Sequence, residues 1–183
     1  MDGSRRPGGF TLIELLLTVT MIGIVSAIAV PSLSRARAVS GEASTIGSLR
    51  ALNSGALSYA SACGGGSFAP SVTWLAKPAG TGKVTGKAAF VGPEFTADTI
   101  DRLNYRIRFT AGTVDAKSPV GCNGVAAGQG LKNYFIGADP LVTSPGTGTR
   151  HFGTSSDNTI FASDARISAF YGGTPPAPAK PIQ

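Results

Sequence analysis

The chain has 183 residues, 16 Lys and Arg against 10 Asp and Glu, and a formal net charge of +6. The 25 Gly, the 12 Pro and the 8% of aromatic residues indicate a loop-rich body without a large hydrophobic interior. One His and two Cys leave too few ligands for a zinc site, so we expect no metal centre.

The N-terminal part of the sequence contains a long apolar run. From Phe10 to Val30 there are 21 residues, and Glu14 carries the only charge among them. As a helix this run is about 30 Å long, which matches the hydrocarbon core of a bilayer. A carboxylate inside it costs roughly 2.5–3.5 kcal/mol on insertion scales. We therefore expect Glu14 to have a partner.

Three general kinds of N-terminal segment share some of these features. A signal anchor would also place Arg5 and Arg6 before an apolar run. A secretory signal peptide could be cut near Ala27-Ile28-Ala29, and Ser4-Arg5-Arg6 hints at a twin-arginine signal. Against all three, the run is long for the apolar core of a signal, and a carboxylate at Glu14 is unfavourable there.

The residues Gly9-Phe10-Thr11-Leu12-Ile13-Glu14-Leu15-Leu16 resemble the N-terminal signature of type IV prepilins and the related type II secretion pseudopilins. In that family an inner-membrane prepilin peptidase cuts after the glycine and N-methylates the new first residue. The resemblance implies a leader of residues 1–9, cleavage between Gly9 and Phe10, and methylation of Phe10. It also implies that Pro31 bends the helix.

The resemblance further implies that Glu14 pairs with the N-terminal ammonium group of a neighbouring subunit during assembly. Methylation leaves that ammonium group charged, so Phe10 and Glu14 of adjacent subunits can neutralise each other. An unpaired charge is costly in lipid, which makes the pairing favourable. A new subunit would then dock where its carboxylate meets a free N-terminus.

The helix is expected to continue past Pro31, so that residues 10–62 form one helix with a membrane-spanning segment at 10–30. Its second half is predicted to be amphipathic and to cover a sheet. The residues that recur every three or four positions are Val39, Ala43, Ile46, Leu49, Asn53, Leu57 and Ala60, and Leu52, Ala56 and Tyr59 widen this stripe. Gly41, Gly47 and Gly55 each weaken the helix by about 1 kcal/mol relative to Ala.

Residues 63–171 are predicted to form a globular β domain that begins with a long connection. A helical turn is expected at 97–103, capped near Thr96 or Asp98. The predicted strands are Asn104–Val114, Asn133–Gly137 and a hairpin of Arg150–Thr154 with Thr159–Ala162. The fold class is therefore α+β, a long helix on a small antiparallel sheet of three to four strands, as the resemblance to type IV pilins also implies. The proline-rich residues 172–183 are predicted to be a disordered tail.

Cys63 and Cys122 both lie beyond the membrane segment. An even number of cysteines in an exported domain predicts one disulfide, formed in an oxidising compartment. Two unpaired buried thiols are the alternative.

A catalytic role has little support in the sequence, and we expect no enzymatic activity and no cofactor. His151 is the only histidine, and no nucleophile elbow or metalloprotease motif is present. Asp157 and Asp164 are weak candidates for a calcium site. Arg106 and Arg108 share one strand face, and the lysines in loops are Lys77, Lys83, Lys87, Lys117 and Lys132. This basic charge could attract DNA or anionic surfaces, although a solvated sheet face is the simpler interpretation.

Together these features predict a structural subunit of a type IV pilus or related filament. The resemblance implies as partners the prepilin peptidase, an assembly platform protein, and other pilin subunits in a helical polymer. It also implies storage in the bacterial inner membrane, with the N-terminus cytoplasmic, before export into an extracellular or periplasmic filament. A type II secretion pseudopilin is the first alternative, and a signal-bearing secreted or membrane-anchored binding protein is the second.

Overall fold

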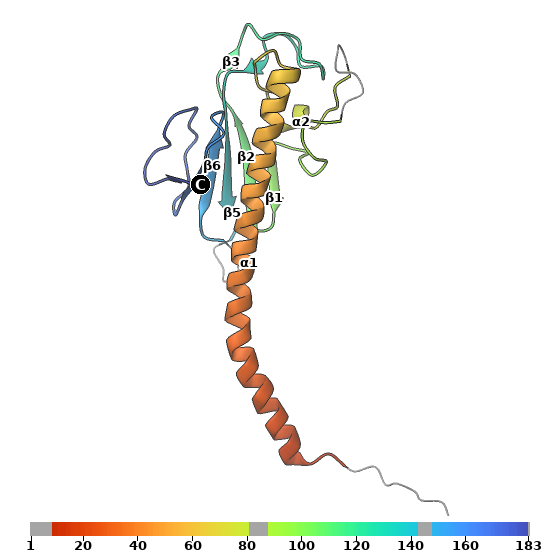
Figure 1. Ribbon diagram of the computed structural model, residues 1–183, viewed down its shortest axis with the longest axis vertical. Helices are drawn as coiled ribbons and strands as arrows, with labels where there is room; N and C mark the ends of the chain where they lie inside the picture. The colour runs from red at the N-terminus through yellow and green to blue at the C-terminus, as the bar shows by residue number, and fades with distance from the viewer. Residues whose placement is uncertain (1–8, 81–87, 143–147, 183) are drawn as a thin grey trace, which may run out of the picture.

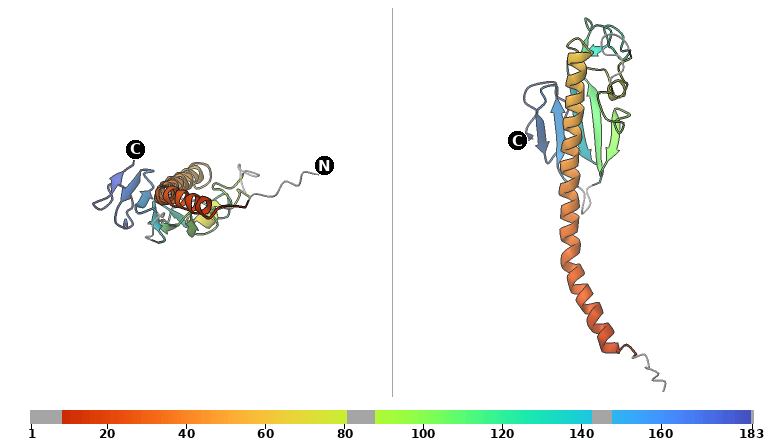
Figure 2. Two further views of the ribbon diagram at one scale, coloured as in Figure 1. Left: turned by 90° about the horizontal axis from the view of Figure 1, so that it is seen from below. Right: turned by 45° about the vertical axis from the view of Figure 1, so that its right-hand side comes forward.

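The computed structural model describes residues 9–80, 88–142 and 148–182. A single long helix, α1 (Leu12–Ala62), has its C-terminal half against one face of an antiparallel sheet, and its N-terminal half extends away from the sheet (Figure 1). Two further views show the same two layers (Figure 2). The predicted α+β class, a long helix laid on an antiparallel sheet, is confirmed.

The main sheet has six strands in the order β1-β2-β5-β6-β7-β8, and each neighbouring pair is antiparallel. These strands are β1 (Thr99–Arg102), β2 (Tyr105–Ala111), β5 (Tyr134–Pro140), β6 (His151–Ser155), β7 (Ile160–Ser163) and β8 (Lys180–Pro181). A second sheet pairs β3 (Val114–Asp115) with β4 (Gly130–Leu131), and a short helix, α2 (Val72–Leu75), follows α1. The globular part that carries both sheets is called the head below.

The predicted helical turn at 97–103 is wrong, because β1 forms an edge strand there. The backbone turns from β1 into β2 at Leu103 and Asn104, which have φ angles of 46° and 68°. This left-handed turn is uncommon for Leu, and the sequence therefore gave no strong turn signal. Asp98 does not cap a helix in its own segment, but accepts a hydrogen bond from the Val72 N–H at the start of α2, at 2.7 Å.

The C-terminal residues also differ from their prediction. Over the described range 172–182 they are not a disordered tail, because β8 pairs with β7 at the edge of the sheet. The Ile182 N–H continues this pairing by donating to the Ile160 carbonyl oxygen at 2.8 Å. Pro181 is tolerated because an edge strand does not need every backbone N–H for the ladder.

The main core lies between α1 and the inner face of the sheet. The fully buried large side chains of the helix include Leu49, Leu52 and Tyr59, which meet sheet residues such as Tyr105 and Ile136. The buried face is rotated from the predicted stripe, since Val39 and Leu57 are 67% and 53% exposed. Leu52, Ala56 and Tyr59, which lay at the margin of the predicted stripe, are at the centre of the buried face.

Asn53 of α1 makes two polar contacts with the sheet inside this interface. The Asn53 side-chain amide donates to the Thr154 hydroxyl at 2.7 Å and accepts from the Tyr134 hydroxyl at 3.0 Å. Burial raises the pKa of Tyr134 above its usual value, so its hydroxyl stays a donor. Nearer the N-terminus, the Glu42 carboxylate accepts from Arg150 Nε at 2.9 Å.

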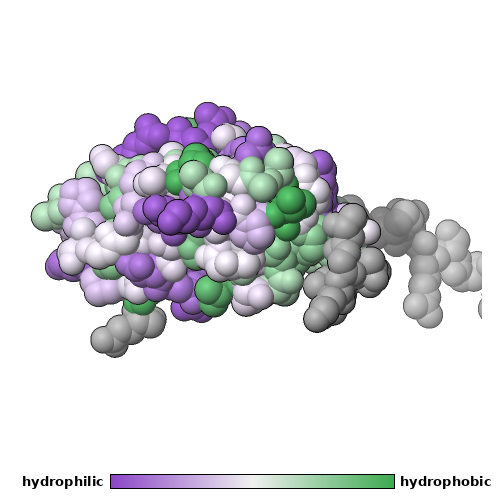
Figure 3. All heavy atoms as spheres, turned by 90° about the horizontal axis from the view of Figure 1, so that it is seen from above, coloured by the Kyte–Doolittle hydropathy of each residue, from purple (hydrophilic) through white to green (hydrophobic). Residues whose placement is uncertain are grey.

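The predicted disulfide is present. Cys63, directly after the last helical residue, is bonded to Cys122, 59 positions further on. The bond ties the end of α1 to the loop between β3 and β4 at the end of the head that is remote from the N-terminus. That end has a mixed surface, with separate apolar residues among hydrophilic ones (Figure 3).

Two glycines of α1 provide a matched test of packing. A Cβ atom at Gly55 would lie 2.5 Å from Val91 Cγ1 and 2.6 Å from the Phe90 carbonyl oxygen, whereas one at Gly47 would meet nothing within 4 Å. We expect Gly47→Ala to stabilise the chain by about 0.5–1 kcal/mol, the helix preference of Ala over Gly. Gly55→Ala should destabilise it by roughly 1–3 kcal/mol, because overpacking outweighs that preference. Urea unfolding of the full chain in detergent measures both, and equal effects would contradict the close approach at Gly55.

Candidate functional site

The N-terminal half of α1 presents an apolar surface that the rest of the described chain does not cover. Every residue from Gly9 to Leu33 is exposed, and large side chains such as Ile22 and Val25 are 65% exposed. An 18-residue window of the helix has a mean hydropathy of 2.3, and none of it is buried. By length and composition the helix can cross a membrane, and its exposed half differs in this respect from the core helix of a soluble protein.

The helix begins with a capping box formed by Thr11 and Glu14. The Thr11 hydroxyl accepts a hydrogen bond from the Glu14 N–H at 3.3 Å. In return, Glu14 Oε2 accepts from the Thr11 hydroxyl at 3.1 Å and from the Thr11 N–H at 3.5 Å. A carboxylate here also interacts favourably with the positive end of the helix dipole.

The capping box gives Glu14 a partner within its own chain, which the sequence analysis missed. The spacing Thr-x-x-Glu directly before an apolar run is the signal that could have identified it. The cap uses only Oε2 of the carboxylate, and no donor to Oε1 occurs among the described residues. Glu14 can therefore keep its cap and accept a further hydrogen bond at Oε1.

The predicted cleavage point lies directly before this cap. Gly9 is exposed and has no regular secondary structure, and Phe10 is 72% exposed. Residues 1–8, which include Arg5 and Arg6, lie outside the described residues. An exposed, irregular peptide bond between Gly9 and Phe10 is accessible to a peptidase without unfolding of the helix.

Pro31 lies inside α1 and supplies no backbone N–H to the helix. Figure 1 shows that the helix is straight alongside the sheet and bends in its exposed half, the half to which Pro31 belongs. The missing hydrogen bond is a physical reason for a bend there.

The two arginines of the predicted basic strand face are each paired with an aspartate. Arg106 Nε donates to Asp101 Oδ1 at 2.8 Å, and this interaction lowers the pKa of Asp101. Arg108 pairs with Asp139, which is also close to His151 Nδ1 and Arg166. The pairing removes much of the excess positive charge on which attraction to DNA would depend. Lys83 and Lys87 lie outside the described residues.

The weak calcium candidates have a different environment from a calcium loop. Asp157 Oδ2 accepts a hydrogen bond from the Gly173 N–H at 2.7 Å and so anchors the C-terminal segment. Within residues 9–80, 88–142 and 148–182, no group of three or more His, Cys, Asp or Glu side chains could hold a metal ion.

Residues 4–30 match a family model described as the prokaryotic N-terminal methylation motif. This match confirms the resemblance found from Gly9 onward, and it covers residues 4–9 of the leader, the capping box and most of the exposed apolar run. No curated protein and no solved structure matches the chain.

Proposed function

This chain carries the N-terminal signature of type IV prepilins and pseudopilins, and we propose that it is a structural subunit of a type IV pilus or related filament, without catalytic activity of its own. Prepilin peptidase cuts between Gly9 and Phe10 and methylates Phe10. The subunit waits in the inner membrane, with its N-terminus cytoplasmic, until an assembly platform protein adds it to the filament.

The observation that carries this proposal is the signature placed at the start of an uncovered apolar helix. In the membrane, lipid covers the exposed half of α1, and in a filament the same surface packs against the helices of neighbouring subunits. Both environments exclude water from side chains that the head leaves exposed. The head stays outside the membrane, where oxidising conditions support the Cys63–Cys122 disulfide.

Assembly needs a contact that fixes the position of each new subunit. Glu14 provides it by accepting, at the unoccupied Oε1, a hydrogen bond from the Phe10 ammonium group of a neighbour. In a water-excluded helix bundle such a charge-assisted bond is strong, and each charge offsets the burial cost of the other.

Intact-mass and N-terminal analysis of the protein from its host tests the processing step. We expect a mature chain that lacks residues 1–9 and begins at Phe10 with one added methyl group. A strain without prepilin peptidase is the control and should retain the complete leader. A mature chain that begins at Val30 would instead indicate an ordinary cleaved signal.

A type II secretion pseudopilus would use the same signature, and the location of the polymer distinguishes it. Filaments sheared from the cell surface that contain this chain assign it to a pilus. Loss of protein export in a deletion strain, without such filaments in the wild type, assigns it to a pseudopilus.

A further inference from the structure

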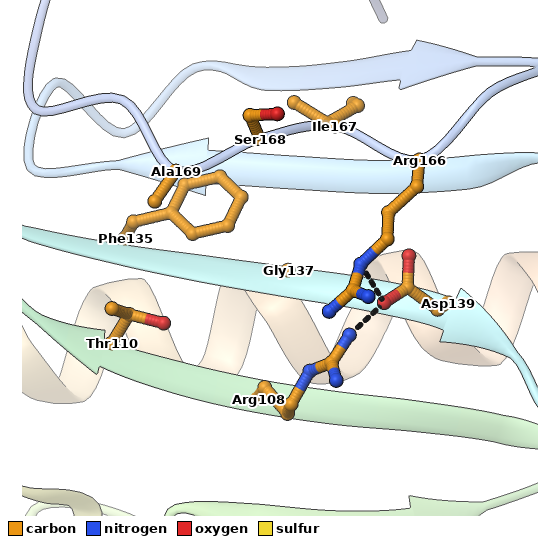
Figure 4. Close-up of a pocket in the computed structure, with 9 residues that line it drawn as sticks. All are labelled: Arg108, Thr110, Phe135, Gly137, Asp139, Arg166, Ile167, Ser168 and Ala169. Atoms are coloured by element: carbon orange, nitrogen blue, oxygen red, sulfur yellow. Dashed lines mark hydrogen bonds and ion pairs between the residues drawn. The ribbon is translucent and has the colours of Figure 1, made fainter.

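The sheet face turned away from α1 carries a pocket that the filament function does not use. A cavity of about 400 Å³ lies between β2, β5 and the segment 166–169, with the helix behind the sheet (Figure 4). Arg108 reaches it from β2 and Arg166 from the segment above, and both guanidinium groups meet at Asp139. The pocket thus joins three charged residues that are far apart in the sequence.

This cluster has more positive than negative charge. Arg166 Nε lies 3.1 Å from Asp139 Oδ2, the oxygen that Arg108 also contacts, and His151 Nδ1 lies 2.8 Å from Oδ1. With His151 neutral, the two guanidinium groups and one carboxylate sum to a charge of +1. In the part of the chain that the structure describes, neither arginine is paired with a second acid. Because each guanidinium group has five N–H donors, most of the donors remain available to a ligand.

At the floor of the pocket, the missing side chain of Gly137 makes room for the Phe135 ring. Gly137 lies opposite Arg108 in the register of β2 and β5, and a Cβ atom there would be 3.0 Å from Phe135 Cε1. The Phe135 ring is 5% exposed, because it packs against Ile167 and Phe170, and it adds only a narrow apolar edge to the pocket. Thr110 and Ser168 add hydroxyl groups. The volume is much larger than a carboxylate and falls within the range of small-molecule sites.

We propose that this pocket binds a uronic acid, free or as a unit of an acidic polysaccharide. Its carboxylate occupies the planar fork geometry of Arg108 and Arg166, which suits a carboxylate better than a point charge would. One net positive charge matches one carboxylate. A C–H edge of the sugar ring meets the exposed edge of Phe135, and the sugar hydroxyl groups exchange hydrogen bonds with Thr110 and Ser168.

Galacturonate and galactose provide a matched pair of probes, because they differ only in the carboxylate. With the full chain in detergent, calorimetric titration should show saturable binding of galacturonate and at least tenfold weaker binding of galactose. Arg166→Gln should weaken galacturonate binding at least tenfold. The control is Arg106→Gln, which removes an arginine that is two positions from Arg108 but is paired with Asp101 outside the pocket, and it should leave binding unchanged.

Gly137→Val tests the shape of the pocket rather than its charge: the valine side chain would displace the Phe135 ring, and the variant should abolish binding. Arg166 is 63% exposed at its side chain, so its variant keeps the test valid even if the glycine variant does not fold. Retention of the protein on immobilised polygalacturonate, with immobilised dextran as the neutral control, distinguishes binding of a polymer from binding of a free sugar. Binding of either acidic probe that is lost in Arg166→Gln supports the proposal. Equal binding of galactose, an unchanged affinity in Arg166→Gln, or no binding of either acidic probe would overturn it.

Discussion

A chain with Glu14→Gln is expected to be cleaved and methylated normally but to enter filaments about 100-fold less than the wild type. Glutamine can accept the Thr11 N–H bond, so the capping box is retained while the charge is removed. The Phe10 ammonium group of the neighbour is then left without its counter-charge in an apolar bundle. Burial of an unpaired charge costs roughly 2.5–3.5 kcal/mol on insertion scales, which corresponds to about 100-fold in docking.

Quantification of sheared filaments, with cleavage followed by mass, measures this effect. Glu14→Ala removes both the cap and the charge and should assemble no better than Glu14→Gln. Thr11→Ala weakens the cap but keeps the carboxylate, so it should assemble far better than either. Normal filaments from Glu14→Gln together with a defect in Thr11→Ala would assign Glu14 a capping role and contradict the pairing with Phe10.

Replacement of both cysteines by serine is expected to destabilise the head by roughly 4 kcal/mol, the chain-entropy value for a loop of this length. The disulfide closes a loop with a sequence separation of 59 residues, which contains β1, β2 and the long connection after α1. With a urea m value of about 2 kcal/mol/M, the unfolding midpoint should fall by about 2 M.

The same shift should appear when the wild type is reduced before unfolding, and reduction should not affect the double serine variant. This comparison separates the loss of the crosslink from any effect of serine at Cys63, which is 8% exposed. A double variant within 1 kcal/mol of the wild type would show that the denatured chain gains little freedom from the broken bond.

The elements that the sequence predicted correctly are those with a strong local pattern. The apolar run and its continuation specify α1, and the alternation around Ile107 specifies β2. By contrast, β1 ends in an uncommon Leu-Asn turn, and β8 lies in a proline-rich segment that resembles a linker. Both edge strands form because a neighbouring strand offers unpaired backbone groups, which a local pattern does not reveal.

The site residues divide in the same way. Gly9, Phe10 and Glu14 lie within the contiguous matched motif, and their roles are predictions made from the sequence. The pocket requires Arg108, Asp139 and Arg166, which are brought together by the register of β2 with β5 and by the path of the chain after β7. Asp139 lies in β5 beyond the end of the predicted strand Asn133–Gly137, so the sequence offered no reason to place Asp139 beside Arg108.

The contact between α1 and the head is fastened at both of its ends. Glu42, among the first buried residues of the helix, is ion-paired with Arg150, and the covalent Cys63–Cys122 link lies at the opposite end. A pull along the helix axis loads this contact in shear, and sliding would have to break the ion pair and then strain a covalent bond. Under tension each subunit of a filament would therefore behave as a stiff block, and the uncovered half of the helix would supply the elastic extension.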